Sequence, residues 1–247
     1  MKVLILAAGY GTRLYPYIKK IPKPLLKVKN RPIIDYLLDK ILELDGVSSI
    51  VVVTNAKFFE YFKSWKEKKS IKHLYIINDK STTPENRLGV IRDMELVFNR
   101  QGSHEDFLVL GGDNFFSDSL SGFMDFAKAK KPKATIGVYD VGSKKEASNY
   151  GVLSINKGSR LVKFEEKPKA PQSTLVGMCL YYFPAKRLKL IKKYLKDGKH
   201  NQDAVGNYIK WLIKEDKVYG FVFKNLWCDI GRIQTYKKLN ETLNKRG

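Results

Sequence analysis

Four short, continuously apolar runs recur through the first half of this 247-residue chain. They lie at residues 3–7, 50–53, 74–77 and 107–110. Strands that are buried on both faces of a sheet have this pattern, as in parallel sheets. Each run is followed by a segment with helical periodicity, at residues 32–44, 56–69, 87–98 and 120–130. Strand and helix in alternation at this spacing predict a parallel α/β sheet.

The alternation of strand and helix patterns ends at about residue 134. Strand-like segments joined by short polar connections follow at residues 135–139, 151–155, 161–165 and 174–183. Helical patterns at 185–196, 204–215 and 234–245 flank two more strand-like segments, at 218–223 and 226–230. Leu153 and Ile155 alternate with polar residues, which is typical of a strand with one solvated face. No linker or repeat divides the chain, so we expect one mixed-sheet domain over residues 1–247.

The charge balance raises the question of an anionic partner. The chain has 46 Lys and Arg against 25 Asp and Glu, a formal net charge of +21. It is 43% hydrophobic and 12% aromatic, which excludes a disordered protein. A nucleic-acid binder would cluster basic residues in a stripe with interleaved aromatic residues. Here the lysines are spread over residues 66–69, 128–133 and 186–199, so we expect no nucleic-acid partner.

The compartment follows from the cysteines and the N-terminus. Cys179 and Cys228 form no CxxC pair, which disfavours a disulfide scaffold or a zinc module. The apolar run at residues 3–8 is too short for a signal sequence. No stretch approaches the roughly 20 apolar residues of a membrane span. We therefore expect a cytoplasmic protein with no membrane partner.

A glycine-rich loop, Gly9-Tyr10-Gly11-Thr12-Arg13, follows the first apolar run. Ligands of open α/β sheets bind outside the carboxyl ends of the strands. Glycines there let backbone N–H groups approach phosphate oxygens. Arg13 adds a planar guanidinium group, whose N–H donors suit phosphate. The loop lacks the third glycine of a dinucleotide fingerprint and the ending of a P-loop. Taken alone, it fits either a phosphate site or an ordinary strand-to-helix turn.

The longer stretch around this loop carries a more specific signal. Residues 6–34 read LAAGYGTRLYPYIKKIPKPLLKVKNRPII. Pro22 and Pro24 fix two φ angles, which predicts an extended segment that presents the Lys23 ammonium. The stretch resembles the nucleotide-binding signature of the sugar-1-phosphate nucleotidyltransferases, LAAG-x-G-T-R-L-x-P followed by P-K-P-L-L and a P-I/L segment.

That resemblance implies a Rossmann-like, three-layer α/β/α mixed sheet of the nucleotidyltransferase type. It implies an NTP-binding half at residues 1–133 and a sugar-phosphate-binding half at 134–247. It also implies that Arg13 and Lys23 are catalytic, by supplying positive charge to the α-phosphate and the leaving pyrophosphate. The nucleotide-binding residues it implies are Leu6, Ala8, Gly9, Gly11, Thr12, Arg13 and Lys23.

Two carboxylates lie in further segments that resemble family elements. Gly111-Gly112-Asp113-Asn114 resembles L/A-G-D-N, and Trp227-Cys228-Asp229-Ile230-Gly231 resembles W-x-D-I/V-G-T. Taken alone, each segment also fits an ordinary turn, because Gly, Asp and Asn are favoured in turns. The resemblance implies that Asp113 and Asp229 hold Mg²⁺ and that Asn114 contacts substrate. Arg232 stands where the pattern usually has Thr.

The remaining substrate residues come from shorter elements. Glu166-Lys167-Pro168 resembles the family's E-K-P, and Tyr150-Gly151 resembles its Y/F-G. The resemblance implies that Glu166 accepts hydrogen bonds from sugar hydroxyls, that Lys167 grips the phosphate, and that Val176 lines the sugar. For the base, Asn78 or Asp79 and then Gly89 are the candidates, because the family's usual Gln or Glu after the third strand is missing.

The implied reaction joins an NTP and a sugar-1-phosphate into an NDP-sugar and pyrophosphate, with Mg²⁺ as cofactor. The sequence favours dTTP or UTP with glucose-1-phosphate. A CTP-dependent cytidylyltransferase acting on inositol phosphate or phosphocholine is the alternative. Outside the enzymes, a nucleic-acid binder or a regulatory relative that keeps only the fold is the alternative. A homo-oligomer is compatible with the sequence, which does not specify one.

Overall fold

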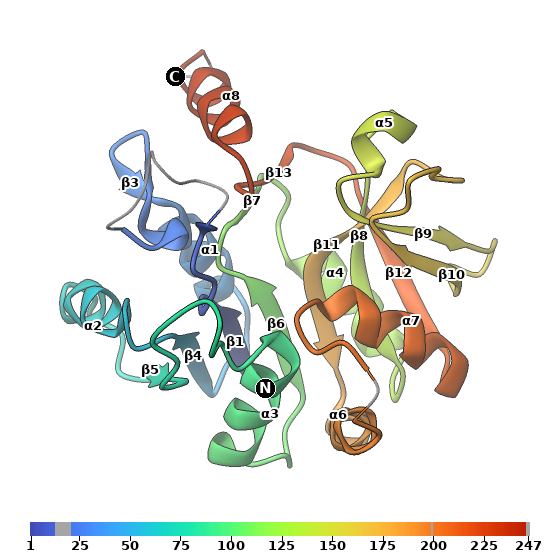
Figure 1. The fold of residues 1–247 in the computed structure, drawn as a ribbon, viewed down its shortest axis with the longest axis horizontal. Coiled ribbons are helices and arrows are strands. Elements are labelled where there is room, and N and C mark those ends of the chain that lie inside the picture. The colour runs from blue at the N-terminus through green and yellow to red at the C-terminus, as the bar shows by residue number, and fades with distance from the viewer. Residues whose placement is uncertain (13–20, 199, 246–247) are drawn as a thin grey trace. The chain divides into compact units, whose positions relative to one another are not determined.

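The computed structural model describes residues 1–12, 21–198 and 200–245. The chain divides into two compact units that interleave along the sequence (Figure 1). The N-terminal unit comprises Lys2–Leu88, Leu110–Ser117 and Asn225–Gly247. The central unit comprises Met1, Gly89–Val109 and Asp118–Lys224. These units differ from the predicted halves, because residues 89–109 and 118–133 lie in the central unit and the last segment returns to the N-terminal unit.

The N-terminal unit contains the predicted parallel strands. They are β1 (Lys2–Leu6), β4 (Ser49–Thr54) and β5 (Leu74–Asn78). β4 pairs in parallel with both neighbours, so that Val51 lies beside Leu4 on one side and Tyr75 on the other. Every residue of β4 is buried, which is why this run is apolar without alternation. Two amphipathic helices, α1 (Ile33–Leu42) and α2 (Phe59–Glu67), follow β1 and β4 in the chain.

The segment around Lys23 differs from the prediction. Lys23 begins a single 3₁₀ turn, η2 (Lys23–Leu25), in which the Leu25 N–H donates to the Pro22 carbonyl oxygen at 2.9 Å. The extended conformation is therefore found at Pro22 and not at Lys23. Pro24 is tolerated in this turn because the first residues of a helix have no internal acceptor for an N–H. A short hairpin, β2 (Lys27–Val28) and β3 (Arg31–Pro32), comes next.

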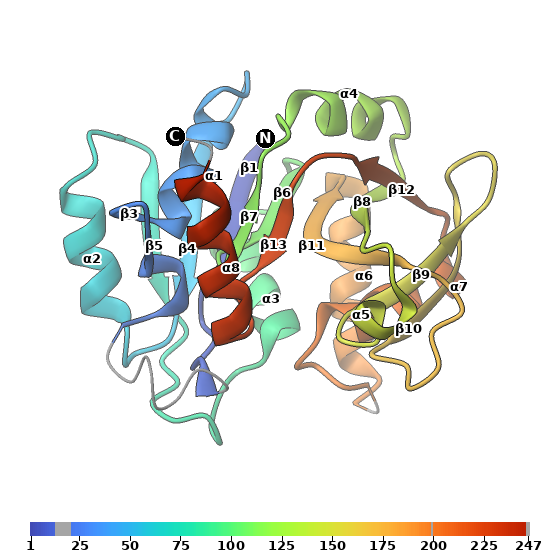
Figure 2. The same ribbon diagram turned by 90° about the horizontal axis from the view of Figure 1, so that it is seen from above.

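The end of the chain completes the N-terminal unit. β13 (Trp227–Asp229) pairs antiparallel with β7 (Asn114–Phe116), and α8 (Ile233–Asn244) follows (Figure 2). The Tyr236 hydroxyl donates to the Lys27 carbonyl oxygen at 2.6 Å. One apolar cluster joins the hairpin, α1, β7 and α8, and it consists of Leu26, Val28, Ile33, Phe115, Ile230 and Leu239. Residues about 200 positions apart thus share one core.

The central unit contains a mixed sheet, as predicted. Its strands are β8 (Ala134–Asp140), β9 (Gly151–Ile155), β10 (Leu161–Glu166), β11 (Leu175–Phe183) and β12 (Val218–Phe223). β8 pairs antiparallel with β11 and parallel with β12, and β9 pairs antiparallel with β10 and β11. The first residues of β6 (Phe107–Gly111) belong to this unit and the last two to the other.

Helices complete the central unit. They are α3 (Val90–Gln101), α4 (Ser121–Ala129), α5 (Lys144–Ala147), α6 (Ala185–Lys196) and α7 (Val205–Glu215). α7 packs on β10 (Figure 1). Large aromatic side chains are fully buried here, among them Phe123, Phe183, Tyr194 and Tyr208. Within the described ranges, no helix combines the length and apolar character needed to cross a bilayer.

Candidate functional site

The glycine-rich loop is held at its beginning by β4 and the residue after it. The Ala7 N–H donates to the Val53 carbonyl oxygen at 2.9 Å, and the Thr54 hydroxyl donates to the Ala7 carbonyl oxygen at 3.3 Å. The Asn55 side-chain amide donates to the Ala8 carbonyl oxygen at 2.9 Å. The loop therefore leaves β1 in a fixed direction. Its predicted residues Leu6, Ala8, Gly9, Gly11 and Thr12 are described, whereas Arg13 lies outside the described residues.

The Lys23 side chain links this loop to a carboxylate. A Cβ at Gly11 would lie 3.4 Å from Lys23 Cγ, so the lysine stem passes directly over the glycine. Gly11 also has a φ of +67°, which a residue with a side chain rarely adopts. At its other end, Lys23 Nζ lies 3.5 Å from Asp113 Oδ2. Lys23 thus lies between the loop and Asp113.

Gly112 fixes the position of the next residue, Asp113. Its N–H donates to the Leu6 carbonyl oxygen at 2.9 Å. A Cβ on Gly112 would lie 3.0 Å from that same oxygen and 3.0 Å from Pro24 Cγ. This close approach of the Leu6 backbone and the Pro24 ring requires glycine. It places Asp113 beside the carboxyl end of β1.

The second predicted carboxylate reaches the same place through the β7–β13 ribbon. Asp229 lies opposite Asn114 in the register, and the Ile230 N–H donates to the Asp113 carbonyl oxygen at 2.9 Å. The Trp227 indole N–H donates to the Asn114 side-chain oxygen at 2.8 Å. The Asn114 amide in turn donates to Asp113 Oδ1 at 3.4 Å. Asp113 and Asp229, 116 positions apart in the sequence, therefore lie at one end of one ribbon.

Asp113 and Asp229 carry the carboxylate oxygens that suit Mg²⁺. Among the described residues, no group of three or more His, Cys, Asp and Glu side chains is arranged to hold a metal ion. Mg²⁺ needs fewer, since proteins usually hold it through one or two carboxylates together with substrate phosphates. Asp113 and Asp229 offer such a pair. Cys228 does not compete, because burial, aided by the Asp229 charge, raises the pKa of its thiol to about 12.

The central unit brings a second group of predicted residues together. Glu166 ends β10 and lies opposite Gly151 of β9. Lys167 has a φ of +45°, its N–H donates to the Tyr150 carbonyl oxygen at 3.0 Å, and its Nζ lies 3.3 Å from Glu166 Oε1. The Tyr150 hydroxyl donates to Glu146 Oε1 at 3.2 Å. Val176 is fully buried and lies opposite Val152 in the β11–β9 pair.

The predicted base-reading residues are engaged within the protein. Asn78 Oδ1 accepts the Lys80 N–H at 2.7 Å. Asp79 is buried and accepts the N–H of Ser81 at 2.7 Å and its hydroxyl at 2.8 Å. The Tyr10 hydroxyl donates to the same Ser81 oxygen at 3.0 Å. This chain from Tyr10 to Asp79 was not expected from the sequence, since nothing in the local pattern links the two residues.

Gly89, the other candidate for the base, lies in the central unit. It precedes α3 with a φ of +90°, and a Cβ there would lie 3.1 Å from the Gln202 carbonyl oxygen. Local backbone geometry is enough to explain the glycine.

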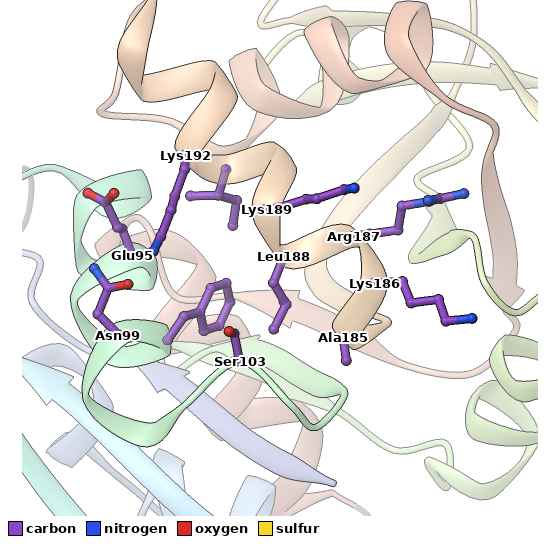
Figure 3. Close-up of a pocket in the computed structure, with 11 residues that line it drawn as sticks. Glu95, Asn99, Ser103, Ala185, Lys186, Arg187, Leu188, Lys189 and Lys192 are labelled. Carbon is purple, nitrogen blue, oxygen red and sulfur yellow. The ribbon is translucent and has the colours of Figure 1, made fainter.

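A separate cavity in the central unit holds none of the predicted residues. It has a volume of about 350 Å³ and lies between α3 and α6 (Figure 3). Its lining includes Phe98 and Leu188, and Lys192 points toward Glu95 and Asn99.

Comparisons with known proteins show the family of this chain. The family model described as nucleotidyl transferase matches residues 2–246. A glucose-1-phosphate adenylyltransferase of Mycoplasma mobile is 31% identical, over 99% of this chain and 67% of its own length. The bifunctional protein GlmU of Methanocaldococcus jannaschii is 30% identical over 94% of this chain. The chain spans 52% of that relative's length.

A solved structure has a similar fold. A Bacillus anthracis protein assigned as a glucose-1-phosphate thymidylyltransferase matches with a TM-score of 0.80 at 24% identity, over 98% of this chain and 94% of its own. The mixed α/β nucleotidyltransferase fold is therefore confirmed. Because the family model matches residues 2–246, the protein belongs to the nucleotidyl transferase family. Its relatives are named as sugar-1-phosphate nucleotidyltransferases, as the sequence motifs imply.

Proposed function

We propose that this protein transfers a nucleotidyl group from an NTP to a sugar-1-phosphate, giving an NDP-sugar and pyrophosphate. The β7–β13 ribbon carries the proposal, because it brings Asp113 and Asp229 together. Lys23 Nζ lies 3.5 Å from Asp113 and its stem passes over the glycine-rich loop. Two hard carboxylates, a cation and a glycine-rich loop match the charge pattern of an NTP with its metal.

In the proposed reaction, an oxygen of the sugar phosphate attacks the α-phosphorus of the NTP in line. A bond forms between that oxygen and the phosphorus, and the bond to the bridging oxygen breaks, so that pyrophosphate leaves with its electron pair. Lys23, and Arg13 as the sequence predicts, stabilise the negative charge that develops on these oxygens. The attacking oxygen is already anionic, so no general base is required.

Asp113 and Asp229 would hold Mg²⁺, which when bound neutralises phosphate charge. The Asn114 amide and the Trp227 indole keep this pair in place through their hydrogen bonds. In the central unit, Glu166 would accept hydrogen bonds from the sugar hydroxyls and Lys167 would meet the phosphate. A cytoplasmic location, expected from the sequence, belongs to the same proposal.

For the substrates, we propose dTTP or UTP with glucose-1-phosphate. The Glu166-Lys167 and Tyr150-Gly151 elements, which lie together in the central unit, favour a hexose phosphate. Relatives of this chain differ in the nucleotide that their names specify: one is an adenylyltransferase and another is assigned as a mannose-1-phosphate guanyltransferase, from Sulfolobus acidocaldarius. A cytidylyltransferase acting on inositol phosphate or phosphocholine is the alternative that the same assay separates.

The test is pyrophosphate release by purified protein with Mg²⁺, across a panel of NTPs and a panel of sugar-1-phosphates. At least one pair should react. Asp113→Asn and Asp229→Asn should each reduce the rate by about 100-fold or more, because each removes a metal ligand. Asp45→Asn, an exposed carboxylate in the same unit, is the control and should react like the unchanged protein.

Two results would overturn the proposal. Folded protein that releases no pyrophosphate from any pair would exclude this activity. Tight, salt-sensitive binding of DNA or RNA in a filter-binding assay, without NTP turnover, would favour the nucleic-acid alternative instead.

A further inference from the structure

We infer that Gly206 of α7 is a positioning residue for Glu166: its missing side chain leaves the space in which the Glu166 carboxylate stands to meet the sugar-1-phosphate. The inference rests on the proposed function, in which Glu166 binds sugar hydroxyls. Both residues lie in the central unit, where α7 packs on β10. Gly206 belongs to none of the motifs that the sequence shares with the family.

The space at Gly206 is taken up by Glu166. A Cβ built there would overlap Glu166 Oε2, and it would lie 3.0 Å from Glu166 Cδ and 2.8 Å from Phe164 Cε1. Distances below about 3.0 Å are shorter than a carbon–carbon van der Waals contact allows. No side chain at this position is compatible with the observed carboxylate.

A second glycine bounds the same space from the sheet. Gly151 lies opposite Glu166 in the β9–β10 pair. A Cβ there would overlap Phe164 Cζ and would lie 3.1 Å from Glu166 Oε2. Oε2 therefore stands between two residues that lack a Cβ. The other oxygen, Oε1, lies 3.3 Å from Lys167 Nζ, so each oxygen has a distinct environment.

The backbone of Gly206 does not itself require glycine. Its φ is not among the positive values found in the described residues, and it lies in the first turn of a regular helix. Glycine is less favourable than alanine in a helix, by about 1 kcal/mol in the helix interior. Glycine stands here because a side chain would overlap Glu166 and Phe164.

The first turn of α7 also suits a carboxylate. Its N-cap, Ala204, offers no side-chain acceptor, and the turn contains no acidic residue of its own. The N-terminal end of a helix carries partial positive charge, which stabilises a nearby negative group. Glu166 supplies that group from β10. A carboxylate held in one place in this way loses little rotamer entropy when a sugar binds.

The test is a double-mutant cycle between Gly206 and Glu166. Gly206→Ala should raise the KM for the sugar-1-phosphate by about 10- to 100-fold, the equivalent of a lost hydrogen bond to a charged group. The KM for the NTP should stay within about 2-fold. In a Glu166→Ala background the same change should add less than about 2-fold, because the carboxylate it displaces is gone. Independent, additive effects would overturn the inference.

Gly220→Ala provides the matched control. Its Cβ would lie 2.9 Å from Val138 Cγ2 and 3.1 Å from Ile155 Cγ2, so it overfills the core of the same unit with no contact to Glu166. It should lower the melting temperature and leave the KM for the sugar-1-phosphate unchanged. An equal rise in that KM for Gly220→Ala would mean that general strain, and not the position of Glu166, causes the effect.

If Gly206→Ala alone does not fold, thermal unfolding of the double variant decides. Recovery of a folded protein in Gly206→Ala/Glu166→Ala supports the inference, because only the carboxylate has been removed. Continued failure to fold would assign the conflict to Phe164 and overturn it. Unchanged protein that shows no turnover on any substrate pair is a different result, since it removes the proposed function itself.

Discussion

At the scale of single residues, this molecule depends on places where a side chain is missing. Gly112 is the clearest case, because a Cβ there would lie 3.0 Å from both the Leu6 carbonyl oxygen and Pro24 Cγ. Backbone atoms and a proline ring cannot move aside cheaply. The residue that follows is Asp113, so the position of a proposed metal ligand depends on the absence of one methyl group.

We predict that Gly112→Ala lowers the free energy of unfolding by about 1–3 kcal/mol, the usual cost of overfilling a packed site. Urea unfolding measures this value. Gly9→Ala is the control: nothing lies within 4 Å of a Cβ at Gly9, and its φ is not positive. It should change stability by less than about 0.5 kcal/mol. Equal losses in the two variants would show that close packing at Gly112 is not the cause.

At the scale of elements, short pieces of structure carry much of the organisation. β7 and β13 have three residues each, too few to show a period in the sequence. Their pairing nevertheless joins Asn114 to Asp229. In the central unit, Asp216 connects three elements at the turn between α7 and β12. It pairs with Lys133, just before β8, and with Arg187 of α6, whose Nε lies 2.5 Å away.

Asp216 makes the central unit sensitive to acid. Burial opposes its ionisation, but Lys133, the Lys217 N–H and Arg187 together hold the pKa of this carboxyl below its usual value. A carboxyl with a lowered folded-state pKa stabilises the fold above its unfolded-state pKa of about 3.9. That stability is lost as the pH falls through the lower, folded-state pKa.

We therefore expect the melting temperature to fall between about pH 5 and pH 2, and to fall less steeply in Asp216→Asn. Differential scanning calorimetry across this range measures both curves. Asp125→Asn, at an exposed position of α4, should follow the curve of the unchanged protein. If Asp216→Asn kept the full acid dependence, this carboxyl would have no part in it.

At the scale of the whole molecule, the charge of +21 acts on every anionic substrate. A field of this sign raises the local concentration of an NTP or a sugar phosphate and speeds their association. Salt screens it, with a Debye length near 8 Å at physiological ionic strength. Among the described residues, the cations proposed to bind substrate are Lys23 of the N-terminal unit and Lys167 of the central unit, a small part of the 46 basic residues.

We predict that kcat/KM for the NTP falls several-fold from about 0.05 to about 0.5 M KCl, because association is screened. The value of kcat at saturating substrate should change less, since bound groups in contact are screened weakly. Steady-state kinetics at each salt concentration separates the two. A kcat/KM that does not respond to salt would mean that the basic surface has no role in drawing substrates in.

The sequence alone determined the parallel strands, since a run such as residues 50–53 has no polar face and has to be buried on both sides. It also determined Asp113 and Asp229 as candidate ligands, because their motifs are local. Only the tertiary structure decided that Lys23 begins a 3₁₀ turn, that Asp79 is bound to Ser81, and that Gly206 leaves room for Glu166. Around Lys23 and Asp79 the chain also packs against other segments, since Pro24 lies close to Gly112 and the Tyr10 hydroxyl donates to Ser81, and Gly206 packs against Glu166 of β10. The pattern within one segment carries no signal of such contacts.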